Sequence, residues 1–510
     1  MIQLEINDIQ GIIRRGYGTL EAACYVLLKI DNSSKTKKWL ANLANRINNG
    51  ENKPSSTDKC INVAFTQLGL NRLGIEKAYD REKKFSIEFE DGMVTDHRKN
   101  ILGDLNTSDP KHWEWGGPTN DSIHVLLLLY AGNQTLLEEL YSDEAGQFAS
   151  GGVSQIKRLE THFLPDRKEH FGFRDGIGQP RVAGLLDKHK TDLGKNISTS
   201  VLQEGGSYNN IIAAGEFVLG YPNAYQKFPN SPKVKKETDT DDILDIDETG
   251  AKDFGKNGSY LVFRQLEQHV GKFWNYVYDH SKLESGEIDK SVSEKLAAKM
   301  IGRWRSGCPI TLSPDQDDPT LKDKDNFGYY PDDKEGDKCP MASHVRRTNP
   351  RNSPLQRKHF NDKEAKNAMV DANKHRIIRR GRAYGEPSLD NNGNPTMEPD
   401  LMLKDGNTGN RKVGLHFLCF NANIGRQFEF IQHTWVNNPK FSELYSEADP
   451  LLGEVSDAEK NNGVFGDFTA PGDLLRTRVR RLEKFVDVKG GAYFFMPGIK
   501  AIKYLSKLHL

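Results

Sequence analysis

The 510-residue sequence predicts an α+β fold made of two similar halves. Short apolar runs that are rich in β-branched and aromatic residues recur along the chain, as expected of buried strands. Segments with apolar residues at helical spacing follow several of these runs. The same kinds of element return in the second part of the chain, although no short-period repeat is visible.

In the first half, residues 24–30 (CYVLLKI) predict a buried strand, and residues 61–65 (INVAF) begin a second one. Residues 124–130 (HVLLLLY) predict a further strand, and the amphipathic stretch at 134–148 predicts a helix after it. This order of strands and helices is that of a ferredoxin-like unit. We therefore expect an N-terminal ferredoxin-like domain over residues 1–230.

In the second half, residues 415–421 (LHFLCFN) predict a strand and residues 426–435 a helix. Residues 491–495 (GAYFF) predict another strand, directly before a final helix near 501–508. We therefore expect a C-terminal ferredoxin-like domain over residues 231–510.

Polar stretches within this second domain predict surface loops. They are poor in hydrophobic residues and rich in Asp, Asn, Gly, Lys or Pro, and they cover residues 233–249, 315–337 and 386–411. We expect the last two to be insertions in the domain.

The composition excludes several classes of protein. Lys and Arg together equal Asp and Glu together, at 71 each, so net charge gives no argument for a nucleic-acid partner. The longest apolar run is too short to span a membrane. Five widely spaced cysteines predict neither a disulfide framework nor a cysteine-based metal site. The first residues, MIQLEINDIQ, lack the pattern of a signal peptide, so we expect a cytoplasmic protein.

Residues 170–180 (HFGFRDGIGQP) carry the densest chemical signal, because three glycines surround Arg174 and Asp175. The glycines permit backbone conformations that approach a flat ligand closely. A tight loop in which Asp175 caps a turn explains the same pattern. No phosphate-binding loop is predicted, because the required lysine and its Ser or Thr follower are missing.

Residues 338–351 (KCPMASHVRRTNPR) place His344 before Arg346, Arg347 and Arg351. Flanking cations disfavour protonation of a histidine, and a neutral imidazole is what a metal binds. A structural histidine remains an alternative.

Residues 375–385 (HRIIRRGRAYG) predict a strand that delivers Arg379 and Arg380 to a turn bounded by glycine. A basic surface strand is the alternative.

Taken together, these three motifs resemble those of the dye-decolorizing peroxidases. NDIQGIIRRGYG at 7–18 is similar to the opening segment of that family, and FVDVKGGAYFFMPGI at 485–499 is similar to its close. The stretches 215–223, 257–274 and 299–310 resemble the middle of the family, so the likeness covers nearly the whole chain. The longer-loop members are the most similar.

The resemblance implies a fold of the dimeric α+β barrel type, with one haem b per chain bound mainly by the C-terminal half. It also implies an enzyme that reduces hydrogen peroxide through a ferryl intermediate and oxidises dyes, phenolics and other small organic donors. A haem-handling protein without significant turnover is the alternative function, and a scaffold without haem is a third. The expected partners are peroxide and reductants, with a possible homodimer, no nucleic acid, no membrane and no encapsulin-targeting tail.

The resemblance also assigns roles to single residues. In the motif GxxDG, here Gly172-Phe173-Arg174-Asp175-Gly176, Asp175 is the distal acid–base residue, and Gly172, Phe173 and Gly176 contact the haem. Arg379 is the distal arginine that stabilises developing negative charge. Arg380 is its competitor, but strand alternation predicts that Arg380 points the other way.

His344 matches the proximal iron ligand, and Asp449 is a candidate for the carboxylate that hydrogen-bonds to it. Arg351 and Arg346 are expected to meet the haem propionates.

Leu415 and Phe417 are expected to line the distal pocket from one face of a strand, with ordinary core packing as the alternative. Such a pocket excludes large molecules, so electrons from dyes must arrive from the surface. Tyr384 and Trp304 are candidate relays, with plain packing as the alternative for both.

Overall fold

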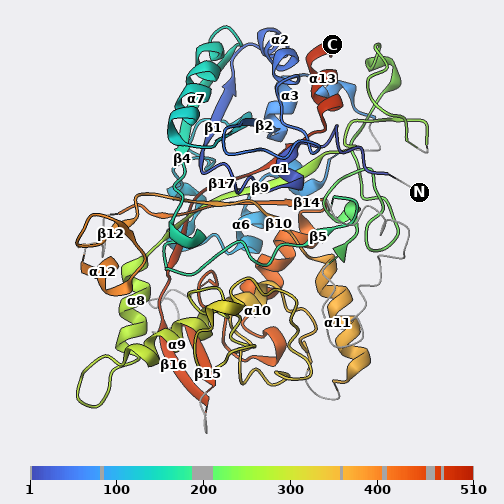
Figure 1. Ribbon diagram of the computed structural model, residues 1–510. Helices are drawn as coiled ribbons and strands as arrows, with labels where there is room; N and C mark the ends of the chain where they lie inside the picture. The colour runs from blue at the N-terminus through green and yellow to red at the C-terminus, as the bar shows by residue number, and fades with distance from the viewer. Residues whose placement is uncertain are drawn as a thin grey trace.

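The computed structural model describes residues 3–80, 85–185, 211–247, 249–356, 360–404, 411–454, 466–471 and 476–508. A single large antiparallel sheet runs through the molecule (Figure 1). Its strands, in spatial order, are β10 (Ile378–Arg379), β14 (Gly414–Asn421), β9 (Ser259–Gln268), β17 (Val486–Met496), β2 (Lys59–Phe65), β3 (Val125–Ala131), β1 (Ala22–Ile30) and β4 (Val153–Glu160), and β11 (Arg382–Tyr384) also pairs with β14.

The two halves of the chain have the same strand order. The N-terminal strands lie as β4-β1-β3-β2, and the C-terminal strands lie as β17-β9-β14-β10. In both sets the fourth strand flanks the first, and the third lies between the first and second, which is the ferredoxin-like arrangement. The fold-class prediction is therefore confirmed. The domain boundary at 230/231 stays a prediction.

Among the described residues, one ladder pair joins the two sets of strands, and a β-bridge between His162, just after β4, and Ala383 of β11 connects their outer edges. Phe495 of β17 is paired with Phe65 of β2. Both phenylalanines are fully buried, so apolar packing supports this short junction.

The sheet is apolar on both faces. In β1, Cys24, Val26 and Leu28 point toward one core, and Tyr25 and Leu27 point toward the other. Helices α2 (Ser33–Leu43), α7 (Gln134–Phe148), α8 (Val270–Asp279) and α9 (Lys290–Ile301) contribute to the first core. Near the second core lies the N-terminal segment with α1 (Gly11–Arg14). In Figure 1, α2, α7 and α13 (Ile499–Lys507) lie at the top, and α8, α9, α10 (His344–Thr348) and α11 (Asp362–Lys374) lie below the sheet.

The helix predicted at 426–435 forms, but it is wider than an α-helix. Two consecutive π-helical turns, Gly425–Glu429 and Ile431–Val436, replace it. Hydrogen bonds from Glu429 N to Ile424 O and from Asn437 N to Gln432 O each join residues five positions apart, whereas an α-helix joins residues four positions apart. Such turns are rare and occur often at functional sites.

The predicted polar loops carry little regular structure. The stretch 315–337 holds one short 3₁₀ turn, Pro319–Leu321. The stretch 386–411 holds a small hairpin of β12 (Ser388–Leu389) and β13 (Pro395–Thr396) and the helix α12 (Pro399–Lys404), while its residues 405–410 lie outside the described part.

All five cysteines are buried and free of disulfides. Across the described residues, no helix combines the length and apolarity that a membrane crossing requires.

Candidate active site

A cavity of about 230 Å³ lies between the sheet and the segments that follow α9. Its lining combines an apolar majority with a few charged groups. The apolar wall includes Phe171, Phe173, Ile177, Leu266, Ile301, Val345, Ile377, Leu415, Phe417, Phe428, Ile431, Val436, Leu451, Leu452 and Val486. The ionisable groups are Glu169, Arg174, Asp175, Arg303, Asp325, His344, Arg351, Arg376 and Arg379.

The Asp175 loop is shaped by two glycines. Gly172 has φ 91° and Gly176 has φ 81°, values that other residues adopt at a cost. A Cβ at position 172 would also approach the carbonyl oxygen of Met397 to 3.1 Å. The loop presents Phe173 and Asp175 to the cavity, whereas Gly172 and Gly176 supply its bends and do not appear in the cavity wall.

Arg379 and Asp175 form an ion pair within the cavity. Arg379 Nη1 donates to Asp175 Oδ1 at 2.7 Å. Burial raises the pKa of the Asp175 carboxyl, but the charge and hydrogen bond of Arg379, together with the backbone N–H of Gly176, outweigh burial and leave this pKa below its ordinary value. Asp175 is therefore an anionic proton acceptor over a wide pH range.

The strand register explains why Arg379 reaches the cavity and Arg380 does not. Arg379 is paired with Cys419 in β14, so its side chain shares a face with Leu415 and Phe417. Arg380 points to the opposite face, where its guanidinium donates to the carbonyls of Ile12 and Ile13.

His344 begins the short helix α10 (His344–Thr348) and lines the same cavity. Its Nδ1 is hydrogen-bonded to Asp449 Oδ2 at 2.9 Å. Asp449 is held in turn by the backbone N–H groups of Leu451 and Leu452, which donate to Oδ1. Asp449 therefore fixes the proton on Nδ1, which leaves Nε2 as the ring atom for a ligand.

The electrostatic setting of His344 differs from the one expected from its neighbours in sequence. Arg347 turns away and donates to the carbonyls of Trp435, Asn438 and Glu447. Burial lowers the pKa of His344, but Asp449 outweighs burial and raises it. The carboxylate, and not the flanking arginines, determines the charge preference of this imidazole.

Arg346 does not reach the cavity. Its guanidinium is fully buried, forms an ion pair with Asp333 at 2.9 Å and donates to Ser353 and the Cys339 carbonyl. The prediction that Arg346 meets a propionate is therefore not supported, because its donors are already satisfied. Arg351 does line the cavity, where it donates to the Asp325 and Phe327 carbonyls.

The two relay candidates occupy different places. Tyr384 is stacked on His416, with ring centroids 4.5 Å apart, and is absent from the cavity lining. Trp304 is 4% exposed and donates to the Ser313 carbonyl at 2.7 Å. It borders an outer hollow that also contains Arg174, and Arg174 lines the cavity as well.

Sequence reasoning missed several lining residues. Phe428, Ile431 and Gln432 reach the cavity through the π-helical turns, which a period of 3.6 residues does not reveal. Glu169 and Gln268 were also missed, although Glu169 directly precedes the HFGF motif.

The cavity fits haem in its chemistry. The Nε2 of His344 would bind the iron, the walls are largely apolar, and Arg351, Arg303 and Arg376 would supply cations for the two propionates.

Comparisons with known proteins bear on the family of the chain. The family model described as the DyP dimeric alpha+beta barrel domain matches residues 8–165. The multifunctional dye peroxidase DyP2 of Amycolatopsis is 34% identical over 433 residues, which cover 78% of this chain and 74% of that protein. The chain belongs to the dye-decolorizing peroxidase family. The dye-decolorizing peroxidase msp1 of Mycetinis scorodonius is 29% identical over 462 residues, covering 87% of this chain and 75% of the relative.

Solved structures of dye-decolorizing peroxidases have the same fold. An ancestral D-type member superimposes with a TM-score of 0.73 at 27% identity, covering 98% of this chain and 99% of that chain. A member from Anabaena gives a TM-score of 0.72 at 24% identity and covers 98% of this chain and 94% of its own.

Membership confirms the predicted activity class and cofactor. The protein is a peroxidase, an oxidoreductase that takes hydrogen peroxide as acceptor, and haem is its cofactor. The haem carrier and the scaffold without haem are thereby set aside.

Proposed function

We propose that the chain is a haem peroxidase in which Asp175 and Arg379 activate hydrogen peroxide and His344 binds the iron. The observation that carries the proposal is that the Asp175–Arg379 pair and the His344–Asp449 pair line one cavity. The first pair supplies a proton acceptor and a fixed cation, and the second supplies an oriented imidazole.

Bound haem supplies the redox-active iron at which peroxide is reduced. The carboxylate of Asp175 accepts a proton from the incoming peroxide and returns it to the departing oxygen. The guanidinium of Arg379 holds Asp175 ionised and stabilises the negative charge that develops when the O–O bond breaks. His344 holds the cofactor through Nε2, and its Nδ1–H donates to Asp449.

We propose dyes, phenolics and other organic molecules as the electron donors. The relatives named as dye peroxidases and dye-decolorizing peroxidases support this class. Leu415 and Phe417 narrow the cavity, so bulky donors release their electrons at the protein surface. Trp304 borders the outer hollow and is therefore better placed than Tyr384 to relay these electrons to the haem.

An absorption spectrum before and after one equivalent of peroxide tests the assignment. The parent protein should show a Soret band that changes in one defined step, and Asp175→Asn should keep the resting spectrum but lose most of the rate. A parental rate in Asp175→Asn would reject the role of Asp175.

A homodimer and a cytoplasmic location stay predictions. Sedimentation of the purified haem protein tests the first, and fractionation of the source cells tests the second.

A further inference from the structure

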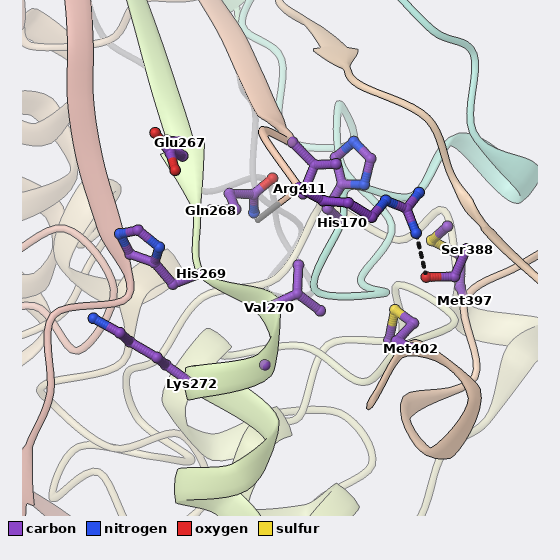
Figure 2. A pocket seen from close by; sticks show the side chains of 12 residues that line it. His170, Glu267, Gln268, His269, Val270, Lys272, Ser388, Met397, Met402 and Arg411 are labelled. Atoms are coloured by element: carbon purple, nitrogen blue, oxygen red, sulfur yellow. Dashed lines mark hydrogen bonds between the residues drawn. The ribbon is translucent and has the colours of Figure 1, made fainter. Parts of the chain in front are cut away.

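A second, smaller cavity of about 70 Å³ shares Gln268 with the haem cavity, and Figure 2 shows the side chains that line it. Its walls carry polar and sulfur-containing side chains together, namely His170, Gln268, Arg411, Ser388, Met397 and Met402. Its lining also includes Lys272, which is exposed, and the half-buried His269, so this cavity reaches the protein surface. We call it the side cavity.

Gln268 forms the partition between the two cavities. It is the last residue of β9 and the only described residue that lines both spaces. Figure 2 places its side chain on the side of β9 that faces His170 and Arg411, away from Glu267 and His269. The adjacent residues Glu169 and His170 line opposite spaces, with Glu169 in the haem cavity and His170 in the side cavity.

A hydrogen bond across this partition connects Gln268 to Glu169. Gln268 Nε2 donates to Glu169 Oε2. The same oxygen accepts from Phe171 N at 2.9 Å, and Oε1 accepts from Phe173 N at 3.0 Å. These three donors hold the Glu169 carboxylate in place at the wall of the haem cavity.

The other end of the Gln268 amide lacks a partner. Gln268 is 7% exposed, and its Oε1 is buried with no hydrogen-bond partner among the described residues. An unsatisfied buried acceptor costs about 1–3 kcal/mol, so such an atom points to a bound donor such as water. The amide can also turn over, so that Oε1 accepts from a protonated Glu169 and Nε2 faces the side cavity.

The chemistry of the enzyme requires a supply of protons. Hydrogen peroxide, two electrons and two protons give two molecules of water. Cleavage of peroxide needs no net proton, because Asp175 returns the one it accepts. When donors release only electrons at the surface, both protons must enter the haem cavity separately.

We propose that Glu169 and Gln268 form a proton-loading port from the side cavity into the haem cavity. The port rests on the active site proposed above. When the Gln268 contact opens, the Glu169 carboxylate takes up a proton that water in the side cavity relays from the bulk solvent, so that this water is left unchanged and Glu169 becomes a neutral acid. Glu169 then passes this proton through water to the Asp175 carboxylate and returns to its anionic form. Two such transfers supply the two protons of one turnover.

The charges around Glu169 suit this role. Burial and, less strongly, the charge of Asp175 raise the pKa of Glu169, while the two backbone donors and Gln268 oppose the change, so that its pKa is about 7. Both protonation states are therefore accessible near neutral pH. His170 does not compete, because burial lowers its pKa to about 4. The other acids in the haem-cavity wall are Asp175 and Asp325, its cations are Arg174, Arg303, Arg351, Arg376 and Arg379, and the imidazole of His344 faces the same space. In the side cavity, Glu267, His269, Lys272 and Arg411 are the remaining charged or titratable groups.

The variants Glu169→Gln and Gln268→Leu test the port in the haem-loaded enzyme. Stopped-flow mixing with one equivalent of peroxide should give a rate within about threefold of the parent for both variants. The return to the resting spectrum with a bulky dye as donor should be about tenfold slower or more, and proton uptake followed by a pH-indicator dye should slow equally. Glu169→Asp should recover part of the lost rate, because it restores the acid.

Infrared difference titration gives a readout that does not depend on turnover. The protein without haem should show a carboxylic acid C=O band that titrates near neutral pH and disappears in Glu169→Gln. Glu144→Gln is the matched control, because Glu144 is a fully buried glutamate on α7 that lines neither cavity. It should keep the band, the proton uptake and the return rate.

Two results would overturn the port: parental proton uptake in both variants, or loss of the peroxide step itself while haem remains bound. Failure of the active-site assignment would appear elsewhere, as a parental peroxide rate in Asp175→Asn. If Glu169→Gln does not fold, Gln268→Leu decides alone, through the ratio of its peroxide and return rates.

Discussion

Arg379 donates to Asp175 across 2.7 Å, although the two residues lie 204 positions apart in the sequence. Asp175 belongs to a loop that follows the N-terminal strands, and Arg379 to an edge strand of the C-terminal set. The ion pair therefore joins the two halves at the proposed catalytic position.

Removal of either member of this pair should slow peroxide activation and spare haem binding. We expect Asp175→Asn and Arg379→Leu each to lower the second-order rate constant with peroxide by about 10²–10⁴-fold, since each removes a proton acceptor or a fixed cation. Stopped-flow absorbance measures this constant. Asp166→Asn, an exposed charge change on the preceding turn, serves as the control and should react at the parental rate.

The pH dependence should follow the lowered pKa of Asp175. A carboxyl with a lowered pKa stays ionised as the pH falls below its ordinary value of about 3.9, so peroxide activation should persist in acid and disappear only below that pH. In Arg379→Leu, burial is no longer opposed by the cation, and the acid limb should move to higher pH. Rate–pH profiles of the parent and of Arg379→Leu measure this shift, and acid limbs at the same pH in the two proteins would contradict it.

The pairing of His344 with Asp449 should govern haem retention. His344→Ala should lose the imidazole that binds the iron and should therefore bind haem weakly. Asp449→Asn should retain it with about 10–100-fold lower affinity, because the imidazole loses the acceptor that orients it. Transfer of haem to an excess of a haem-free acceptor protein measures the difference. Equal transfer rates in the parent and in Asp449→Asn would show that this contact is dispensable.

Truncation of the apolar wall should widen access. Leu415→Ala and Phe417→Ala should raise kcat/KM for phenols too bulky for the parent cavity, because both side chains line it. Their cost in stability should fall below the about 2–5 kcal/mol typical of a core Leu→Ala change, since both side chains border open space. Oxidation assays with phenols of graded size, together with thermal unfolding, test this.

The relay role of Trp304 can be separated from peroxide chemistry. Trp304→Phe should leave the rate constant with peroxide unchanged and lower the rate of dye oxidation severalfold, because the indole that relays electrons beside the outer hollow is lost. Tyr384→Phe should change the rate of dye oxidation little, because Tyr384 lines neither the haem cavity nor the outer hollow. An equal loss in the two variants would contradict this distinction.

Local patterns were sufficient to predict the strands. The runs at 24–30, 124–130 and 415–421 became β1, β3 and β14 with ends displaced by at most two residues. Each of these strands is buried on both faces and is therefore a continuous apolar run, a pattern that the sequence alone reveals.

Features that depend on three-dimensional pairing were not predictable. The junction of Phe65 with Phe495 joins strands from opposite ends of the chain, and the hydrophobicity of neither strand specifies its neighbour. Arg346 and Arg351 belong to one motif, but only Arg351 lines the cavity. Arg346 is held away from it by hydrogen bonds to Asp333 and to the Cys339 carbonyl. The π-helical turns replace the expected α-helix through backbone hydrogen bonds that side-chain spacing does not encode.

The position of β17 has a consequence for how the enzyme matures. This strand is among the last elements of the chain, yet it fills the place between β9 and β2 in the sheet. A ribosome delivers the chain from its N-terminus, so the first four strands can assemble while β17 is still unmade. The central strand that joins the two sets is then missing, and the cofactor must wait for it. Because Val486 of β17 also lines the haem cavity, we expect stable haem binding to begin only after this strand has been made.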